Sequence, residues 1–157
     1  MASKLSIRTA GPGDAAVIAD FNLRLCRETE HRELDPDTVR AGVKHVLSDA
    51  SKGRYFVAMP SDNPGEIVGC LLITHEWSDW RNGDIWWIQS VYTRADYRGR
   101  GVFRGLYEHV RNAAREAGAA GLRLYVERDN DAALATYDKL GMHETPYRMM
   151  EVMFASE

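Results

Sequence analysis

The residues best suited to chemistry lie in one glycine- and arginine-rich stretch, DYRGRGVFRGL, from Asp96 to Leu106. It follows an apolar run and precedes apolar residues at helical spacing, so a strand, a loop and a helix are expected in that order. Two of its glycines, Gly99 and Gly101, let the backbone approach an oxyanion closely, and the next helix offers unpaired N–H groups. Arginines form charge-assisted hydrogen bonds to phosphate, and three stand here: Arg98, Arg100 and Arg104. The stretch is predicted to bind a diphosphate.

Two well-known phosphate-binding patterns do not fit this stretch. A nucleotide triphosphatase loop ends in Gly-Lys-Ser/Thr, whereas Val102 and Phe103 follow Gly101. The dinucleotide-binding fingerprint has its third glycine where Arg104 stands. An exposed turn followed by a basic helix start is the alternative interpretation.

Apolar spacing predicts the element order β-αα-ββ-β-α-β-α-β along the chain. Helices are expected at about 15–27, 39–48, 103–117 and 133–140, and strands at about 5–7, 54–59, 66–74, 84–93, 122–126 and 145–154. The 157 residues suit a single domain, 1–157, and 45% hydrophobic with 27% charged residues is typical of a soluble globular protein.

Composition and spacing argue against several partners. The net charge of −3 disfavours nucleic acid, and no long apolar span or signal peptide predicts a membrane location, so the cytoplasm is expected. Cys26 and Cys70 lack metal-type spacing, and the five histidines form no HxxxH or HxH pair. No metal site is expected.

Two segments resemble the GNAT acetyltransferase family. Arg98 and Gly101 match its Arg/Gln-x-x-Gly-x-Gly/Ala signature, although Phe103 takes the final small position. NDAALATYDKLGM, from Asn130 to Met142, is similar to the family's Asn-x-x-Ala-x-x-x-Tyr-x-x-Leu-Gly-Phe segment. The element order is also that of the family.

This resemblance implies the fold and the cofactor. The fold would be α/β (α+β), with a mixed, mostly antiparallel sheet of six to seven strands, about four helices, and a splay between strands 4 and 5. The cofactor would be acetyl-coenzyme A, with Tyr137 facing its thiol and Asn130 holding the pantetheine arm. Taken alone, Tyr137 also fits a core tyrosine on an amphipathic helix.

The end of the strand before the loop would hold the pantetheine arm. Free backbone groups there can pair with its amides as an added strand would. The predicted cofactor-binding residues are Val91, Tyr92, Thr93, Arg98, Gly99, Arg100, Gly101, Val102, Phe103, Arg104, Asn130 and Tyr137.

Direct attack of an amine on the thioester, through a tetrahedral intermediate, needs an N–H donor for the oxyanion and an acid near sulfur. The predicted groups are a backbone amide near Tyr92 and the phenol of Tyr137. Many relatives carry a glutamate where Gln89 and Ser90 stand. Deprotonation would then need water, an amine that arrives neutral, or another carboxylate; the candidates are Glu28, Glu30, Glu76 and Glu127.

The acceptor site is predicted to consist of Glu28, Glu30, Glu76, Trp77, Trp80, Gln89, Tyr125 and Tyr147. Carboxylates beside tryptophans favour a cationic amine, such as a polyamine, an amino acid or an aminoglycoside. Alternatively, the tryptophans pack a sheet edge or a dimer contact and the glutamates are solvated.

The predicted function is N-acetylation of a small primary amine. A homodimer is expected, since dimers are frequent in the family. Acetylation of a peptide or protein, or acyl-coenzyme A binding without catalysis, is the alternative.

Overall fold

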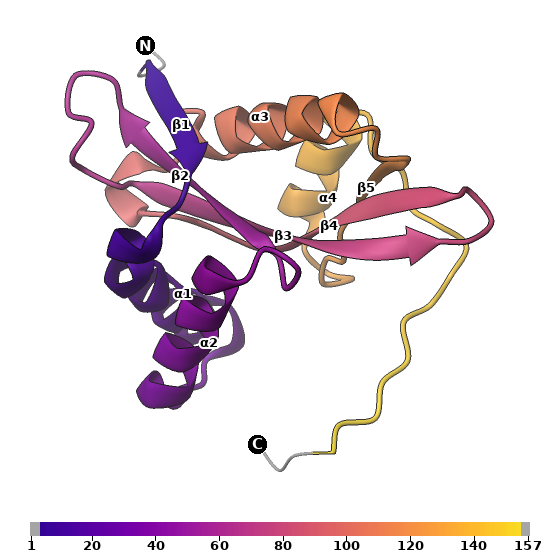
Figure 1. Cartoon of the computed structure of the whole chain (residues 1–157), viewed down its shortest axis with the longest axis horizontal. Helices are drawn as coiled ribbons and strands as arrows, with labels where there is room; N and C mark the ends of the chain where they lie inside the picture. Colours follow the sequence, from indigo (N-terminus) through magenta and orange to yellow (C-terminus); the bar gives the residue numbers. More distant parts are fainter. Residues whose placement is uncertain (1–3, 155–157) are drawn as a thin grey trace. The chain divides into compact units, whose positions relative to one another are not determined.

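A computed structural model describes residues 4–154 of the chain. These residues form two compact units, one up to Leu124 and one from Tyr125 onward. The first unit contains a sheet and three α-helices, and the second contains one α-helix followed by an extended C-terminal segment (Figure 1).

The sheet of the first unit has five strands in the order β1-β2-β3-β4-β5. They are β1 (Leu5–Thr9), β2 (Arg54–Pro60), β3 (Gly69–Ser78), β4 (Gly83–Thr93) and β5 (Gly121–Arg123). Neighbouring strands are antiparallel, except that β4 and β5 are parallel. The mixed, mostly antiparallel sheet predicted from the sequence is therefore confirmed.

Helices cover both faces of this sheet. The α-helices of the unit are α1 (Ala15–Glu30), α2 (Pro36–Ser48) and α3 (Val102–Glu116). Side chains of β2 point alternately to the two faces, so Tyr55 lies in the core with Ile18 and Val43 of α1 and α2. The ring of the neighbouring Phe56 instead lies 5.4 Å from the ring of His109 in α3. Helices α1 and α2 therefore lie on one face of the sheet, and α3 lies on the other.

Both cysteines are buried free thiols. Cys70 of β3 lies in the core beneath α1 and α2, where burial raises its pKa to about 12. Cys26 lies on α1. Residues 4–154 contain no cluster of three or more potential metal ligands and no helix that is long and apolar enough to span a membrane.

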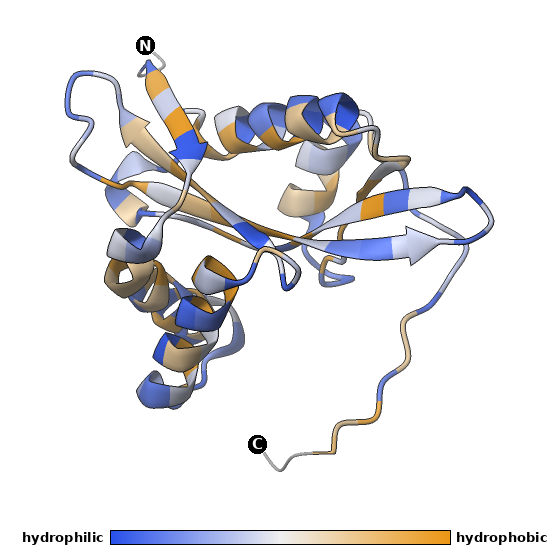
Figure 2. Ribbon diagram, in the orientation of Figure 1, coloured by the Kyte–Doolittle hydropathy of each residue, from blue (hydrophilic) through white to orange (hydrophobic). Residues whose placement is uncertain are grey.

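The second unit contains α4 (Asp131–Lys139), and no strand follows it up to residue 154. The strand expected at 145–154 is therefore not formed, and the described sheet has five strands instead of six to seven. Alternating side chains favour a strand, but a strand also needs a neighbour that supplies backbone hydrogen bonds. Figure 2 shows that this extended segment contains hydrophobic residues. Their side chains are exposed, up to 95% for Phe154.

Gly69 allows α3 to lie close to the sheet. A Cβ atom at this position would lie 2.7 Å from Cγ1 of Val102 and 3.1 Å from the backbone oxygen of Tyr92. Both distances are shorter than a van der Waals contact, so any side chain here would push the start of α3 away from β3 and β4.

We predict that Gly69→Ala lowers the free energy of unfolding by about 1–3 kcal/mol, because the added methyl group overpacks this contact. Urea unfolding measures the change. Gly42→Ala in α2 is the matched control: its Cβ would meet nothing within 4 Å, so it should stabilise the helix by about 0.5–1 kcal/mol. Equal stability of Gly69→Ala and the unmodified protein would show that α3 tolerates a wider separation.

Candidate active site

The second half of β4 lacks a partner on one side. Strand β5 pairs with β4 only at Ile85, Trp86 and Trp87, which leaves residues 88–93 without a neighbouring strand on that edge of the described sheet. On the other side, Leu72 pairs with Ser90 and Ile73 with Ile88. Gln89 is thus the extra residue of a β-bulge, a feature that is frequent beside active sites. The free edge includes the three residues predicted to pair with the pantetheine arm.

The glycine loop joins this edge directly to α3. After the 3₁₀ helix η2 (Ala95–Tyr97), Gly99 and Gly101 take left-handed conformations, with φ of 75° and 82°. A Cβ atom at either glycine would meet nothing within 4 Å, so the loop has open space beside its backbone. The first hydrogen bond of the α3 ladder joins the N–H of Gly105 to the carbonyl of Gly101.

Two amides at the start of α3, those of Val102 and Arg104, therefore have no intrahelical acceptor. Together with the open loop, they fit a diphosphate at a helix N-terminus. Phe103 departs from the small residue of the family signature, but its ring packs along the helix, 6.2 Å from the ring of Tyr107.

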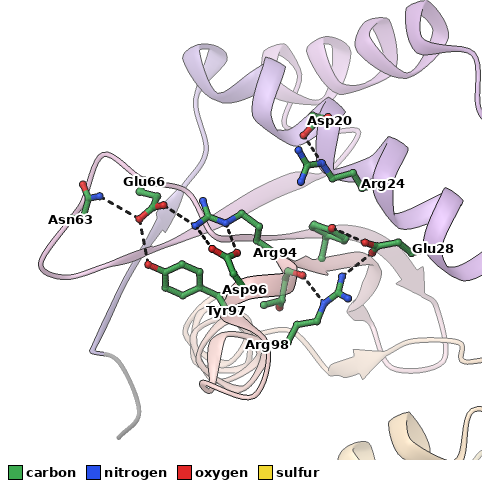
Figure 3. A network of polar contacts seen from close by, with 11 residues as sticks. Asp20, Arg24, Glu28, Asn63, Glu66, Arg94, Asp96, Tyr97 and Arg98 are labelled. Atoms are coloured by element: carbon green, nitrogen blue, oxygen red, sulfur yellow. Dashed lines mark hydrogen bonds and ion pairs between the residues drawn. The ribbon is translucent and has the colours of Figure 1, made fainter.

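The three arginines of the loop have different partners within the protein. Arg98 bonds Oε2 of Glu28 at 2.7 Å and the carbonyl of Thr93 at 3.0 Å (Figure 3). The guanidinium of Arg100 lies 5.0 Å from the ring centre of Tyr97. Arg104 forms an exposed i,i+4 ion pair with Glu108. Arg98 and Arg104 are therefore both engaged in ion pairs within the protein, whereas the contact given for Arg100 is with an aromatic ring.

A charged network fixes the chain just before the loop. Arg94 bonds both carboxylate oxygens of Asp96 and, at 2.7 Å, Oε1 of Glu66 (Figure 3). Glu66 also accepts hydrogen bonds from the Tyr97 hydroxyl at 3.3 Å and from Asn63 at 3.2 Å. Bonding to Asp96 and Glu66 raises the pKa of Arg94, and bonding to Arg94 lowers that of Asp96. Sequence reasoning missed this anchor, because Glu66 and Arg94 lie on separate elements.

Glu28 is the predicted acceptor-site carboxylate that lies beside β4. It belongs to the last turn of α1, and its Oε1 accepts a hydrogen bond of 3.2 Å from the Tyr92 hydroxyl. Burial, followed by the charge of Glu28, raises the pKa of Tyr92. Glu30, the last residue of α1, is exposed and pairs with Arg32. The structure thus brings together Glu28, Tyr92 and Arg98, which the sequence assigned to three different roles.

Glu76 belongs to a second polar cluster. Its two oxygens accept hydrogen bonds from the indole N–H of Trp87 at 3.1 Å and from Arg123 at 2.7 Å, which links β3, β4 and β5. Gln89 donates to the hydroxyl of Thr74 at 2.9 Å. Trp77 and Trp80, at the end of the β3–β4 hairpin, are 63% and 88% exposed. Their place in an acceptor site stays a prediction.

The position where relatives carry a strand carboxylate is hydroxyl-rich. Ser90 lies near the hydroxyl of Tyr55, which accepts a hydrogen bond of 3.0 Å from Asn22. Burial raises the pKa of this buried phenol. Tyr55 and Asn22 are polar groups near Ser90 that sequence reasoning missed, since their only signal was polarity at positions of apolar elements.

The second unit holds the remaining predicted residues. Asn130 caps α4, because its side-chain oxygen accepts a hydrogen bond of 3.1 Å from the N–H of Ala133. Tyr137 lies within α4, and burial raises the pKa of its phenol. Tyr125 and Tyr147 are exposed. Their roles at the cofactor and the acceptor stay predictions.

We predict that Gly101→Val removes coenzyme A binding while the protein stays folded, because a β-branched side chain disfavours φ of 82° and fills the open space beside the loop. Isothermal titration calorimetry and circular dichroism measure the two quantities. Gly118→Val is the matched control, since Gly118 also has a left-handed φ of 77° and open space but lies beyond the end of α3. Normal coenzyme A affinity of Gly101→Val would place the diphosphate elsewhere.

Comparison with known proteins agrees with this geometry. Residues 20–142 match the family model described as the acetyltransferase (GNAT) family. The thialysine N-epsilon-acetyltransferase of Bos taurus is 30% identical over 88% of this chain and 84% of its own length. The aminoglycoside N(6')-acetyltransferase type 1 of Stenotrophomonas maltophilia is 28% identical over 92% of this chain and 90% of its own.

A solved structure is also closely similar. A possible acetyltransferase from Clostridium difficile 630 is 42% identical and superposes with a TM-score of 0.89, covering 97% of this chain and 99% of that one. The family match spans more than half of the chain and includes both segments that carried the sequence resemblance. The chain therefore belongs to the GNAT acetyltransferase family and is an acyltransferase that uses acetyl-coenzyme A.

Proposed function

We propose that this protein N-acetylates a primary amine of a small, cationic molecule. The observation that carries the proposal is the free edge of β4, which leads through the short η2 into a left-handed glycine loop and the first turn of α3. Such an edge suits an extended, amide-bearing chain and such a loop suits a diphosphate. Acetyl-coenzyme A combines these two features and supplies an activated acetyl thioester.

The cofactor-binding residues divide by the part that they would hold. Backbone groups of Val91, Tyr92 and Thr93 would pair with the pantetheine arm, together with Asn130. The amides from Arg98 to Arg104 would bind the diphosphate, and one backbone N–H near Tyr92 would stabilise the oxyanion formed by direct attack. The β-bulge at Gln89 supports this assignment, because a bulge re-aims the backbone groups that follow it.

Tyr137 is proposed as the acid that protonates the leaving thiolate. Burial raises the pKa of its phenol above the reference value of about 10, so the group carries its proton at neutral pH. A protonated phenol is a suitable donor to a thiolate.

No carboxylate stands at Gln89 or Ser90 to accept the proton of the amine. Both side chains are neutral: the amide of Gln89 donates a hydrogen bond to Thr74, and the hydroxyl of Ser90 lies near that of Tyr55. We propose that the amine loses its proton to water or binds in its neutral form. Glu28 is the candidate carboxylate that is hydrogen-bonded to the end of β4, through the hydroxyl of Tyr92.

The acceptor is proposed to be an amino acid, a polyamine or an aminoglycoside. The names of the relatives support small amines, since they include a thialysine and an aminoglycoside acetyltransferase. The predicted acceptor residues include three carboxylates, at Glu28, Glu30 and Glu76, but each pairs with an arginine of the protein, so the support for a cationic acceptor comes from the relatives. Acetylation of a peptide or protein N-terminus is the second candidate, and the exposed position of Trp77 and Trp80 favours it, because a peptide needs an open surface.

Acetyl transfer from acetyl-coenzyme A to lysine, spermidine, kanamycin and a set of short peptides tests the proposal, with products identified by mass spectrometry. Acetylated small amines are expected. Products only from peptides would favour the second candidate, and tight coenzyme binding without any transfer would contradict both.

We also propose a homodimer, in the cytoplasm, with one catalytic domain formed by both units. The match of residues 20–142 crosses the boundary between the units and supports one domain. The exposed apolar segment from Tyr147 to Phe154 supports a dimer, because large exposed apolar surfaces mark interaction sites. Sedimentation equilibrium that finds only monomers would contradict the dimer.

We predict that Tyr137→Phe lowers kcat by about 100-fold with little change in the Kd of coenzyme A, since only the acidic proton is lost. An acid acts while it is protonated, so kcat should fall as the pH rises through the raised pKa of Tyr137. This alkaline limb should be absent from the pH profile of the variant. Tyr107→Phe, at a buried tyrosine of α3, is the control. An unchanged kcat for Tyr137→Phe would remove the phenol from the mechanism.

A further inference from the structure

The guanidinium of Arg98 is held on three sides by two other elements. Its terminal nitrogen bonds Oε2 of Glu28 in α1 at 2.7 Å, and its Nε donates to the carbonyl of Thr93 in β4 at 3.0 Å (Figure 3). The guanidinium carbon lies 5.5 Å from the ring centre of Tyr92. These contacts join the last turn of α1 to the residue that directly precedes Gly99.

We propose that Glu28 is a positioning residue for coenzyme A: its carboxylate holds Arg98 and thereby keeps the glycine loop in the conformation that binds the diphosphate. This inference rests on the proposed function of the loop, and it gives Glu28 a role that does not require contact with either substrate.

The loop needs such a support because glycine restricts its own backbone so little. Gly99 and Gly101 can leave their left-handed conformations without steric cost, so ordering them on binding consumes free energy. Arg94 and Tyr97 are fixed to Glu66, and Arg94 also holds Asp96, but this anchor ends one residue before Arg98. Arg98 is thus the last side chain that can restrain the loop from the strand side. Restraint before binding raises affinity by reducing this cost.

The carboxylate of Glu28 is itself positioned by a residue of the core, Tyr92. Its second oxygen accepts a hydrogen bond of 3.2 Å from Tyr92, a residue that is only 3% exposed. The ring of Tyr92 lies 5.0 Å from that of Phe21 in α1. The position of the carboxylate is therefore set by packed side chains, and the carboxylate in turn fixes Arg98 at the start of the loop.

The contribution of this ion pair to global stability should be small. The side chains of Arg98 and Glu28 are 49% and 40% exposed, and exposed ion pairs are weak because water screens them. Loss of the pair should therefore appear in the order of the loop and in coenzyme A affinity, and much less in the unfolding transition.

Glu28→Gln tests the inference, because it keeps the size of the side chain and removes its charge. Titration with coenzyme A alone, without an acceptor amine, should give a Kd that is about 2- to 10-fold higher. Hydrogen exchange at the amides of residues 99–103 should become faster, while exchange within β2 and β3 and the melting temperature stay unchanged. In a protein that already carries Arg98→Gln, Glu28→Gln should have no further effect on Kd.

Glu33→Gln is the matched control. Glu33 forms a two-bond ion pair with Arg27 of α1, at 2.6 and 3.0 Å, near the same helix end. Its loss should leave the Kd of coenzyme A and loop exchange unchanged. Glu28→Gln with an unchanged Kd would overturn the inference, and a lower Kd would show instead that Glu28 competes with the coenzyme for Arg98. Failure of the unmodified protein to bind coenzyme A would contradict the proposed function itself.

Discussion

The unpaired half of β4 is the feature on which the rest of the site depends. A parallel neighbour of only three residues leaves most of the strand's edge exposed to a ligand. An exposed edge normally invites pairing with another chain, and here the bulge at Gln89 interrupts the regular pattern beside it. The same edge leads into the glycine loop, so the position of the strand determines the position of the amides that follow.

Two carboxylates from distant elements restrain the chain between the strand and the helix. Glu66, in the connection from β2 to β3, holds Arg94 and Tyr97, and Glu28 of α1 holds Arg98. The two anchors approach the segment from opposite sides of the loop, as Figure 3 shows. A loop rich in glycine can therefore be well ordered, because its order comes from the side chains that flank it and not from the loop residues themselves.

Much of this architecture could be predicted from the sequence, because it depends on local signals. Glycine at positions 99 and 101 predicted the loop, and apolar spacing predicted α3 and β4 to within a few residues. The pairing of Glu28 with Arg98 and of Glu76 with Arg123 could not be predicted, since each joins residues on elements that only the fold brings together. The end of α1 was placed three residues too early, at 27 instead of Glu30, because its last turn is polar. The bulge at Gln89 could not be predicted either, because the residue types of the strand do not indicate it.

The burial of both cysteines has a practical consequence for enzymology. A thiol reacts as its thiolate, and a pKa of about 12 leaves almost none of Cys70 in that form at neutral pH. Cys26 is shielded within the packed side of α1. Acyl transfer releases a thiol from the coenzyme, so a disulfide dye added to the folded enzyme will report turnover continuously against a low background from the protein.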